Sequence, residues 1–578
     1  MKTARKLMRI MLVTFRFGRD IPGGAERYLW ELMSRLSRAG HDVEVFTTCS
    51  LQMLRSPFGY MLWDDFLPQG VDEIEGVAIH RYPVRNPRPR RASRYWNRLS
   101  TMHERKTRSP EFVTFFCDAL RGSGEHCFLN GWHACEQRGD FKVRWSGKQA
   151  QLVIAGEGIR EVWLEVSTPQ DLYLALGTSD HKQKRFDLEK GKPRRIHAEV
   201  PNRDCLAVSI KVPRTLRPPE DRRDLGVLVH GAGLRDEAGE RELDLSRGWA
   251  EFVQSGPEEV LGEALWWIAN KMPARISRMH KYVMGPCSSS LEREVMRSAP
   301  GFDLVIGSMA PMSTLSLAAE AAAGSGRPFI AFPLFHSRDP NHYFGHLGKA
   351  MAGARGVEAN LQGIADIMTA WGYNAFAVGP GFELEDLLSP HIDGGRFRRE
   401  FGLEASPLLL WVARKNEGKG YREAIAALEY VRSRGCQAEL VMIGPDEDYM
   451  PVSGEGVHYL GPLPREKVLD AYDACDVFIF PSLHESFCLV FGEAWLRGKP
   501  VLGNGYCAAA RGNITHGEDG FLCYDRSQYG QRALELLNDP ALARSMGQRG
   551  KENVVASRGW DRIVRELVAK LEEAVAAE

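Results

Sequence analysis

The sequence predicts an α/β protein with two doubly wound parallel sheets and an all-β module inserted in the first. Two series of apolar strands alternating with amphipathic helices predict the sheets, because this rhythm builds βαβ units. Between the two series the rhythm changes to short alternating strands separated by turn residues, which is typical of a β-sandwich. A chain of 578 residues is also too long for one hydrophobic core.

The first series begins with a strand, a helix and a second strand near the N-terminus. In the helix, Leu29, Leu32 and Leu36 fall on one face, and Gly40 stands where a C-terminal cap belongs. Strands of this series are predicted at IMLVTF (10–15), DVEVFTT (42–48), DLVIGS (303–308), RPFIAFPLF (327–335) and AFAVGPG (375–381).

The second series makes an independent α/β set after Pro407. Strands are predicted at LLLWVAR (408–414), AELVMIG (438–444), VFIFPS (477–482) and PVLGNG (500–505), with helices over 421–434, from about 465 and over 488–498. Ligands of such sheets bind beyond the carboxyl ends of the strands, so the cleft between the two α/β domains is the expected site. The predicted domains are 1–122 with 248–396, the inserted sandwich 123–247, and 397–578, whose last helix returns to the first domain.

The insertion contains short alternating runs such as FKVRWSG, AQLVIAG, EVWLEVST, IHAEVP and LAVSIKVP. Trp132 and Trp145 stand near its start, where they either stack on sugar rings or belong to the core of the sandwich. We expect the insertion to supply no catalytic group, and to hold the acceptor or mediate assembly. Deleting residues 125–234 should then leave nucleotide binding intact.

Composition narrows the class of protein. Basic and acidic residues are equal at 75 each, so no overall positive field favours nucleic acid as a partner. The eleven cysteines are scattered without paired CxxC spacing, which predicts free thiols in a reducing cytoplasm. Arg9 and Arg16 interrupt the first apolar stretch, which therefore predicts a strand rather than a signal peptide, and no apolar window is long enough to span a membrane. We expect a cytoplasmic protein, peripheral to the membrane at most.

Two glutamates in PSLHESFCLVFGEAW suggest the chemistry of the cleft. Glu485 follows the strand that ends near Pro481, and Glu493 lies about two turns into the next helix. Backbone amides at the start of that helix favour an anionic group such as a diphosphate. The two carboxylates cannot bind that anion, and they are suited to accept hydrogen bonds from sugar and ribose hydroxyls.

This arrangement resembles the E-x7-E motif of retaining GT-B glycosyltransferases, specifically glycosyltransferase family 4, over residues 7–560. The resemblance implies that Glu485 contacts the transferred sugar and that Glu493 binds the nucleotide ribose. It further implies that the intervening segment lines the donor site. These residues are Ser486, Phe487, Cys488, Leu489 and Val490, of which Ser486 and Cys488 replace the glycines common in the family.

Two further motifs support the resemblance. ARKNEGKG resembles the Arg-x4-Lys-Gly step of the family, which implies that Arg414 and Lys419 clamp the donor phosphates. A leaving diphosphate needs such a clamp because charge develops on it as the glycosidic bond breaks. IPGGAERYLWEL resembles the glycine-rich turn before the first helix, where Gly23 and Gly24 allow the backbone to approach the donor or the acceptor closely.

Histidines and aspartates near the expected cleft raise the question of a metal ion. His336 follows a strand of the first domain, where the family often places a histidine near the transferred sugar, whereas His342 is more typical of a structural residue. Asp446 and Asp448 imitate an Asp-x-Asp metal motif, but the rest of that other fold is missing, and we expect a solvated loop. The resemblance implies no bound metal.

A basic segment, HRYPVRNPRPRRASRYWNRLS, interleaves arginines with prolines and aromatic residues. It suits either contact with an anionic lipid or lipid-linked acceptor, or a mobile basic loop. The arginines concerned lie within residues 81–98 and are Arg88, Arg90, Arg91, Arg94 and Arg98.

The resemblance implies transfer of a sugar, with retention at the anomeric carbon, from a UDP- or GDP-type nucleotide sugar to a saccharide or lipid-linked saccharide acceptor. No permanently bound cofactor is implied. Two other functions stay open: a sugar-nucleotide epimerase or hydrolase on the same fold, and a glycan-binding protein that has lost catalysis. The base and sugar of the donor cannot be taken from any relative, because Ser486 and Cys488 alter the sugar pocket.

Overall fold

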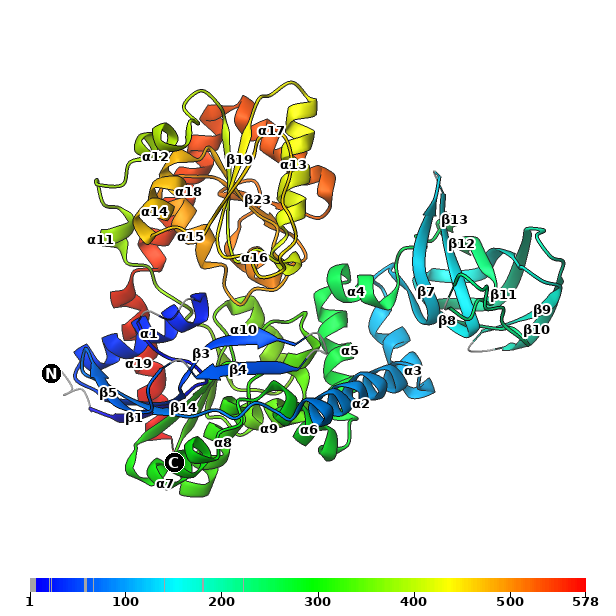
Figure 1. Ribbon diagram of the computed structural model, residues 1–578. Coiled ribbons are helices and arrows are strands. Elements are labelled where there is room, and N and C mark those ends of the chain that lie inside the picture. The colour runs from blue at the N-terminus through cyan, green and yellow to red at the C-terminus, as the bar shows by residue number, and fades with distance from the viewer. Residues whose placement is uncertain are drawn as a thin grey trace. The chain divides into compact units, whose positions relative to one another are not determined.

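The computed structural model describes residues 7–577 except 20, 22, 57–59, 66, 140, 179–180 and 222. The chain divides into two compact units (Figure 1). One unit combines Met1–Trp96 with Ala274–Glu578, and the other spans Asn97–Pro273. The first unit contains two parallel sheets, each with its own helices, so the predicted α/β class with two doubly wound sheets is confirmed.

The first sheet has eight strands in the order β17-β16-β15-β14-β1-β2-β6-β5. All neighbours are parallel except β5 and β6. Its order reverses at β1, which pairs with both β14 and β2, so Ile10 lies between Leu304 and Val43. The strands are β1 (Arg9–Val13), β2 (Asp42–Thr48), β5 (Gly70–Ile74), β6 (Val77–Tyr82), β14 (Leu304–Ser308), β15 (Phe329–Phe332), β16 (Gly356–Glu358) and β17 (Ala375–Phe376).

Helices cover this sheet as the sequence rhythm requires. In α1 (Gly24–Arg38), the predicted apolar face of Leu29, Leu32 and Leu36 is fully buried. A separate antiparallel pair is formed by β3 (Ser50–Arg55) and β4 (Met61–Asp65). The remaining helices of the domain are α6 (Ala274–Met284), α7 (Ser289–Ser298), α8 (Ser313–Ser325), α9 (Gly345–Ala352) and α10 (Gln362–Ala370).

The second sheet has six parallel strands in the order β20-β19-β18-β21-β22-β23. Its strands are β18 (Leu408–Val412), β19 (Glu439–Ile443), β20 (Val457–Gly461), β21 (Val477–Phe480), β22 (Val501–Asn504) and β23 (Gly520–Cys523). Its helices are α11 (Leu384–Leu387), α12 (Gly394–Phe401), α13 (Tyr421–Ser433), α14 (Arg465–Ala474), α15 (Leu489–Leu496), α16 (Ala508–Asn513), α17 (Arg526–Asn538) and α18 (Pro540–Ser557). The predicted domain boundary at 396/397 lies inside α12, which is bound to α14 through the 2.6 Å ion pair of Arg396 and Asp470.

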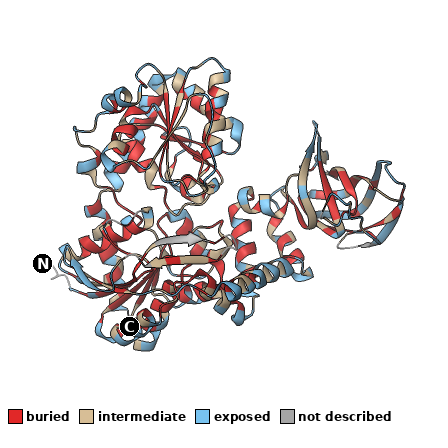
Figure 2. Ribbon diagram, viewed as in Figure 1, coloured by how far each residue is buried: buried red, intermediate tan, exposed pale blue. Residues whose placement is uncertain are grey.

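The strands carry the core of each α/β domain. Figure 2 shows buried residues concentrated along the strands of both parallel sheets. Leu408, Leu409, Leu410 and Trp411 of β18 have no exposed surface, because helices pack on both faces of a parallel sheet. Such strands appear in the sequence as continuous apolar runs, so the apolar runs predicted where these strands lie. The chain ends in α19 (Trp560–Ala576), which packs against α1 and β15 of the first sheet domain.

The unit Asn97–Pro273 contains one seven-stranded sheet rather than two separate sheets, so the predicted sandwich is not confirmed. Three of the predicted strands are a single 27-residue strand, β8 (Phe141–Ser167), and two others form β11 (Arg194–Lys211). Leu228 pairs with both Trp145 and Ser167, so the two ends of β8 approach the same residue and the sheet curls. The other strands are β7 (His126–Arg138), β9 (Leu172–Thr178), β10 (His181–Leu188), β12 (Leu228–Asp236) and β13 (Gly239–Glu242).

Both tryptophans singled out in this unit serve packing. Trp145 is 9% exposed and belongs to a small apolar cluster with Val143, Leu225 and Leu228. The ring of Trp132 packs against the main core, and its indole N–H donates to the carbonyl oxygen of Gln151 at 2.7 Å. The interpretation of these residues as core therefore fits the structure better than sugar stacking.

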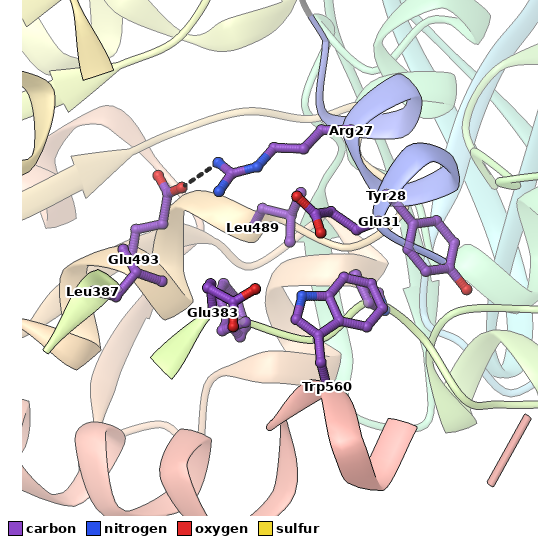
Figure 3. Close-up of a pocket in the computed structure, with 11 residues that line it drawn as sticks. Arg27, Tyr28, Glu31, Glu383, Leu387, Leu489, Glu493 and Trp560 are labelled. Carbon is purple, nitrogen blue, oxygen red and sulfur yellow. Dashed lines mark hydrogen bonds and ion pairs between the residues drawn. The ribbon is translucent and has the colours of Figure 1, made fainter. Parts of the chain in front are cut away.

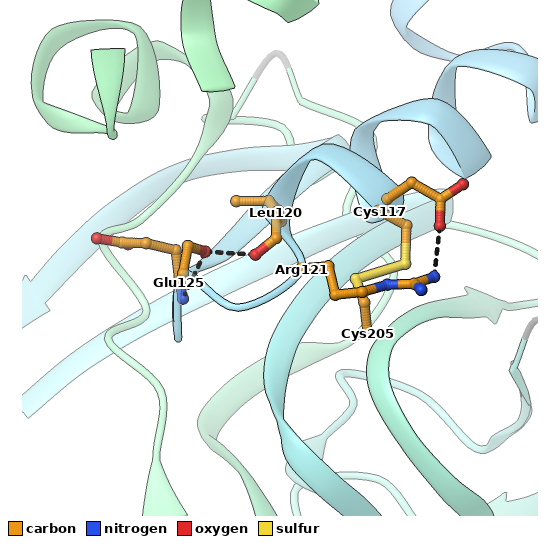
Figure 4. The surroundings of a disulfide bond; sticks show 7 residues. Cys117, Leu120, Arg121, Glu125 and Cys205 are labelled. Carbon is orange, nitrogen blue, oxygen red and sulfur yellow. Dashed lines mark hydrogen bonds and ion pairs between the residues drawn. A yellow bond between two sulfur atoms is a disulfide. The ribbon is translucent and has the colours of Figure 1, made fainter. Parts of the chain in front are cut away.

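The same unit extends beyond the predicted residues 123–247, because it also includes helices at both ends. These helices are α3 (Pro110–Leu120), α4 (Trp249–Ser255) and α5 (Glu258–Asn270), with part of α2 (Pro89–Thr107). A disulfide joins Cys117 of α3 to Cys205 of β11 (Figure 4). The prediction that all cysteines are free thiols is thus wrong for this pair, whose 88-residue separation gave no sequence signal.

The basic segment 81–98 runs mostly through α2 and is not a loop beyond Pro89. Arg88, Arg90, Arg94 and Arg98 are exposed. Arg91 is exposed as well, and its guanidinium lies 4.7 Å from the ring of Tyr282. None of the helices in the described ranges is both long and apolar enough to cross a membrane.

Buried histidines predict a loss of stability in acid. Burial lowers the pKa of His280 to about 3 and the pKa of His103 and His342 to about 4, and it also lowers the pKa of His346. Below pH 6.5 the unfolded chain therefore binds more protons than the folded one, so lowering the pH destabilises the fold. Glu358 has the opposite effect. Burial raises its pKa to about 7, so at this residue the folded chain binds a proton that the unfolded chain has released.

We expect the free energy of unfolding to fall from pH 7 to pH 5, with His280 alone contributing about 2 kcal/mol of the loss. Urea unfolding across this pH range measures the slope. In His280→Gln the slope should be shallower by about one proton. An unchanged slope in that variant would show that His280 is charged, or exposed, in the folded protein.

Candidate active site

The two glutamates of the E-x7-E segment lie at the carboxyl end of β21, where the chain turns into α15. β21 ends at Phe480 and α15 begins at Leu489, so residues 481–488 form the connecting turn, here called the donor loop. Cys488 caps the helix with a left-handed φ of 67°, a conformation that favours glycine. Glycine at this position in the related motif is therefore explained by backbone geometry.

Glu485 forms an ion pair with Lys419, which the family resemblance predicts to bind the donor phosphates. Its Oε1 lies 2.5 Å from Nζ of Lys419 and accepts a 2.7 Å hydrogen bond from the hydroxyl of Ser482. The side chains of Glu485 and Lys419 are each 16% exposed, so little water screens this pair. The structure thus brings together two predicted site residues 66 positions apart in sequence.

Arg414 is engaged with an acidic residue that the sequence analysis did not consider. Its Nη1 lies 2.8 Å from Oε1 of Glu447, whose other oxygen accepts a 2.8 Å hydrogen bond from Asn416. The Arg414 side chain is 52% exposed. An exposed ion pair is weak in water, so a diphosphate could take the place of Glu447.

Asp446 and Asp448, which imitate a metal motif, both bind the buried Lys415. Its Nζ lies 2.8 Å from Oδ1 of Asp446 and also contacts Asp448. The segment is an exposed loop as predicted, but both carboxylates are paired with Lys415, whose side chain has no exposed surface. Across the described ranges, no three or more His, Cys, Asp or Glu side chains are grouped to hold a metal ion.

Lys415 should therefore support the fold rather than the chemistry. Replacing it by methionine leaves two neighbouring carboxylates without their cation, and we expect a loss of about 2 kcal/mol in the free energy of unfolding. The value is near the low end for a buried ion pair because Asp446 is 33% exposed. Urea unfolding measures it. An adjacent exposed arginine, Arg414, offers the matched control, and Arg414→Met should cost no more than a few tenths of a kcal/mol.

Glu493 is buried within α15 and paired with two arginines from different domains. Its Oε1 lies 2.6 Å from Arg465 of the second domain and 3.4 Å from Arg27 of α1. Burial alone would raise the pKa of Glu493, but Arg465 and Arg27 together lower it, so the carboxylate is charged at neutral pH. A buried carboxylate held in this way is suited to accept hydroxyl hydrogen bonds.

A pocket opens beside Glu493 between α1, α15 and α19 (Figure 3). Trp560 and Tyr28 form one wall as a stacked pair with ring centroids 6.3 Å apart. Glu31, Glu383 and Arg27 contribute charged groups. The remaining lining residues are Pro380, Gly381, Phe382, Leu387 and Leu489.

The glycine turn before α1 approaches the donor loop. A side chain at Gly24 would lie 3.5 Å from the side chain of Leu489. Gly23 has a φ of 144°, and any side chain there would clash with the carboxylate of Glu26. Gly23 therefore has a structural reason for lacking a side chain, whereas a side chain at Gly24 would make only an ordinary contact with Leu489 at the start of α15.

His336 reaches the same region from the first sheet domain. Its ring stacks on His342 at a centroid distance of 5.0 Å, and its backbone N–H donates to Nδ1 of His342 at 3.2 Å. Burial, and then the positive charges of His342 and Lys419, lower its pKa well below the usual value. A neutral His336 is therefore placed near Lys419 at neutral pH.

Sequence reasoning missed His484, which precedes Glu485. Burial lowers the pKa of His484 despite the opposing charge of Asp339, and its Nδ1 is buried without a hydrogen-bond partner in the described structure. The only sequence signal was its place next to Glu485 in HES. Arg27 and Arg465 were also missed, because no local pattern links them to Glu493.

The other residues predicted to line the donor site differ in exposure. Phe487 and Cys488 are buried, whereas Ser486, Leu489 and Val490 are partly exposed. Burial raises the pKa of Cys488. The pKa of Cys507, the residue before α16, is lowered because its sulfur accepts hydrogen bonds from the thiol of Cys488 and from two backbone N–H groups. The loop is thus packed on the start of α16.

Comparisons with known proteins point to the same part of the chain. Residues 406–539 match the family described as Glycosyl transferases group 1. The matched segment contains β18, the donor loop and α15, hence Arg414, Lys419, Glu485 and Glu493. The second sheet domain is therefore a glycosyltransferase domain. Glycosyltransferases are enzymes that transfer sugars.

Two curated relatives show the level of similarity. The N-acetyl-alpha-D-glucosaminyl L-malate synthase of Bacillus anthracis is 25% identical over 183 residues, which are 30% of this chain and 47% of that protein. The GDP-mannose-dependent alpha-(1-6)-phosphatidylinositol monomannoside mannosyltransferase of Mycobacterium tuberculosis is 27% identical over 221 residues, 33% of this chain and 57% of that protein. The chain thus spans about half the length of these relatives.

Among solved structures, Anabaena HepE in complex with UDP-glucose aligns with a TM-score of 0.42 at 18% identity. The alignment covers 55% of this chain and 98% of HepE. Staphylococcus aureus TarM aligns over 99% of this chain and 100% of its own, with a TM-score of 0.46 at 10% identity.

Proposed function

We propose that the chain is a retaining GT-B glycosyltransferase of the family 4 type. It moves a sugar from a UDP- or GDP-type nucleotide sugar to a saccharide or lipid-linked saccharide acceptor in the biosynthesis of a polysaccharide or glycoconjugate. The observation that carries the proposal is the 2.5 Å pair of Lys419 and Glu485 within the matched glycosyltransferase domain. In this proposal Lys419 binds the donor phosphate and Glu485 binds sugar hydroxyls, and transfer from a sugar diphosphate requires such groups side by side.

Each site residue has a role in this proposal. Arg414 and Lys419 neutralise the leaving diphosphate, Glu485 binds hydroxyls of the transferred sugar, and Glu493 binds those of the ribose. His336 contributes a neutral polar group to the sugar site. Ser486, Phe487, Cys488, Leu489 and Val490 shape the donor pocket, and Gly23 and Gly24 let α1 approach it. The acceptor hydroxyl attacks the anomeric carbon on the face from which the diphosphate leaves, and the departing phosphate takes the hydroxyl proton, so no protein nucleophile is needed.

Two features favour this function over its alternatives. A glycan-binding protein that had lost catalysis would have no need to keep Arg414, Lys419, Glu485 and Glu493 together. An epimerase or hydrolase on this fold would use the same donor groups, but the glycine-rich turn before α1 together with the E-x7-E segment favours a transferase. Transfer is therefore the function that these residues serve best.

We further propose a cytoplasmic protein that contacts the inner face of the membrane through segment 81–98. The exposed arginines of α2 are suited to anionic lipid headgroups, each contributing about 1 kcal/mol. The lipid-linked substrate in the name of the mycobacterial relative fits such a location. Binding to vesicles with and without anionic lipid tests this part of the proposal.

A thermal-shift panel tests the donor directly. Ligands that bind the folded state raise its melting temperature, by an amount set by concentration relative to Kd. We expect UDP or GDP, with the corresponding nucleotide sugar, to stabilise the wild-type chain and to stabilise Lys419→Ala less. The absence of any shift with UDP, GDP, ADP and their sugars at millimolar concentration would contradict the proposal.

The second unit should be dispensable for donor binding. Because β13, α4 and α5 belong to it, the deletion should span residues 97–273 rather than 125–234. With a Gly/Ser linker in its place, we expect unchanged nucleotide binding and altered acceptor use or oligomeric state, measured by calorimetry and light scattering. A folded deletion that no longer bound nucleotide would show instead that this unit builds part of the donor site.

A further inference from the structure

The chain crosses between the two sheet domains twice, and the crossings are bonded together. The first crossing is the linker of residues 377–382, and the second is the step from α18 to α19 at Arg558 and Gly559. The backbone N–H of Phe382 donates to the carbonyl oxygen of Arg558 at 2.8 Å, and Phe382 forms a β-bridge with Gly559. The side chain of Arg558 also reaches the linker, where its Nη1 donates to the carbonyl oxygen of Val378 at 2.8 Å.

Arg558 also contacts the donor loop. Its guanidinium lies 5.0 Å from the ring centroid of Phe487, two residues beyond Glu485. Phe487 is buried, and its ring faces Phe382 at 6.5 Å. At Gly379 a side chain would lie 3.2 Å from the same ring. Both crossings therefore enclose the aromatic side chain of the donor loop, and Arg558 touches the linker and the loop at once.

A buried carboxylate fixes the linker on the side of the first domain. Oε1 of Glu358 accepts backbone hydrogen bonds from Asn360 at 2.7 Å and Gly379 at 2.9 Å. Glu358 has no exposed surface, and its Oε2 is buried without a hydrogen-bond partner in the described structure. The position of the linker is thus set by Glu358 from one domain and by Arg558 from the return crossing. Phe487 packs against a backbone that has little freedom to move.

We infer that Arg558 is a positioning residue for sugar transfer, which holds Phe487, and through it Glu485, against the two interdomain crossings. The inference rests on the proposed function, since it assigns Glu485 to the sugar. A guanidinium suits this task because it can donate to a carbonyl oxygen while its plane lies over an aromatic ring. Arg558 itself contacts no substrate. Its loss should therefore affect the grip on the sugar more than the binding of the nucleotide.

The experiment separates these two quantities in the full-length protein. Calorimetry with UDP and GDP gives the nucleotide Kd, and release of UDP from UDP-glucose or GDP from GDP-mannose in water gives kcat and KM. In Arg558→Gln we expect a nucleotide Kd within about twofold of wild type and a kcat/KM lower by about tenfold or more. Arg558→Lys, which keeps a charge over the ring, should recover part of the loss. The matched control is Arg562→Gln in the next turn, an exposed arginine bound to Glu566, which should match wild type.

A double variant tests whether Arg558 acts through Phe487. Phe487→Leu should lower kcat/KM to a similar extent, and Arg558→Gln/Phe487→Leu should be no worse than the more severe single variant, because coupled residues are not additive. Unchanged kcat/KM in Arg558→Gln, or losses that multiply in the double variant, would overturn the inference. If Arg558→Gln does not fold, Phe487→Leu and Arg558→Lys decide it, and wild-type kcat/KM in both would overturn it. If the wild-type chain bound neither UDP nor GDP, the proposed function would be contradicted. This inference would then be contradicted too, before any variant is compared.

Discussion

Lys419→Ala should lower the turnover of the proposed sugar transfer by about 100-fold to 1000-fold, the usual cost of removing one fixed charge-stabilising group at a leaving group. The pair with Glu485 places the Lys419 ammonium at 16% exposure, where its charge is poorly screened and strongly felt by a diphosphate. Arg414→Ala should have an effect of the same order, because a free diphosphate can displace Glu447 from this exposed arginine. Steady-state release of the nucleoside diphosphate measures both.

The fold should be nearly unaffected by either change. Neither side chain belongs to the core, so the melting temperature should stay within a few degrees of wild type. Arg422 is the matched control, since it is a basic residue three positions after Lys419 that pairs with Glu417 at 2.6 Å. Arg422→Ala should retain wild-type turnover. Wild-type kinetics in Lys419→Ala and Arg414→Ala, with unchanged melting, would remove both residues from the mechanism.

The strands of the two parallel sheets could be predicted because each is buried on both faces and therefore apolar throughout. DVEVFTT corresponds to β2 at both ends, and LLLWVAR contains all of β18. The position of the site followed from the same reasoning, since the carboxyl ends of β18 and β21 lie side by side in the sheet. The contact of Lys419 with Glu485 is a consequence of that pairing.

The topology of the second unit could not be predicted from local patterns. The runs that end at Gly147 and Gly156 were predicted to be separate strands, yet both glycines lie inside β8, where glycine permits a strand to bend. The pairing of Leu228 with both ends of β8 is a long-range property that no short window contains.

The partners of site residues were equally hidden. No sequence motif singled out Lys415, yet its cation is buried between two aspartates more than thirty positions away. Arg27 and Glu493 are 466 positions apart, so their contact depends on the two sheet domains facing each other. Sequence motifs predicted which charged residues bind the donor, whereas tertiary packing decides which of them are already paired with an opposite charge.

The two glutamates of the donor site should separate nucleotide binding from sugar transfer. Glu493→Gln removes the charge that accepts ribose hydroxyls, so we expect the Kd of the nucleoside diphosphate to rise about 10-fold to 100-fold, the value of a charged hydrogen bond. Glu485→Gln should leave that Kd nearly unchanged, because a nucleoside diphosphate has no transferred sugar to contact. Its turnover should instead fall by about 100-fold. Calorimetry and steady-state kinetics measure the two quantities independently.

The expected asymmetry follows from the two environments. Glu493 is 7% exposed and held by Arg465 and Arg27 away from the clamp, whereas Glu485 touches Lys419 and Ser482 at the start of the donor loop. Glu429→Gln on the exposed face of α13 serves as the control for loss of one negative charge and should change neither quantity. A nucleotide Kd unaffected by Glu493→Gln would place the ribose elsewhere. A nucleotide Kd that rises in Glu485→Gln as much as in Glu493→Gln would mean that the two carboxylates bind one common group, and the division between ribose and sugar would then be wrong.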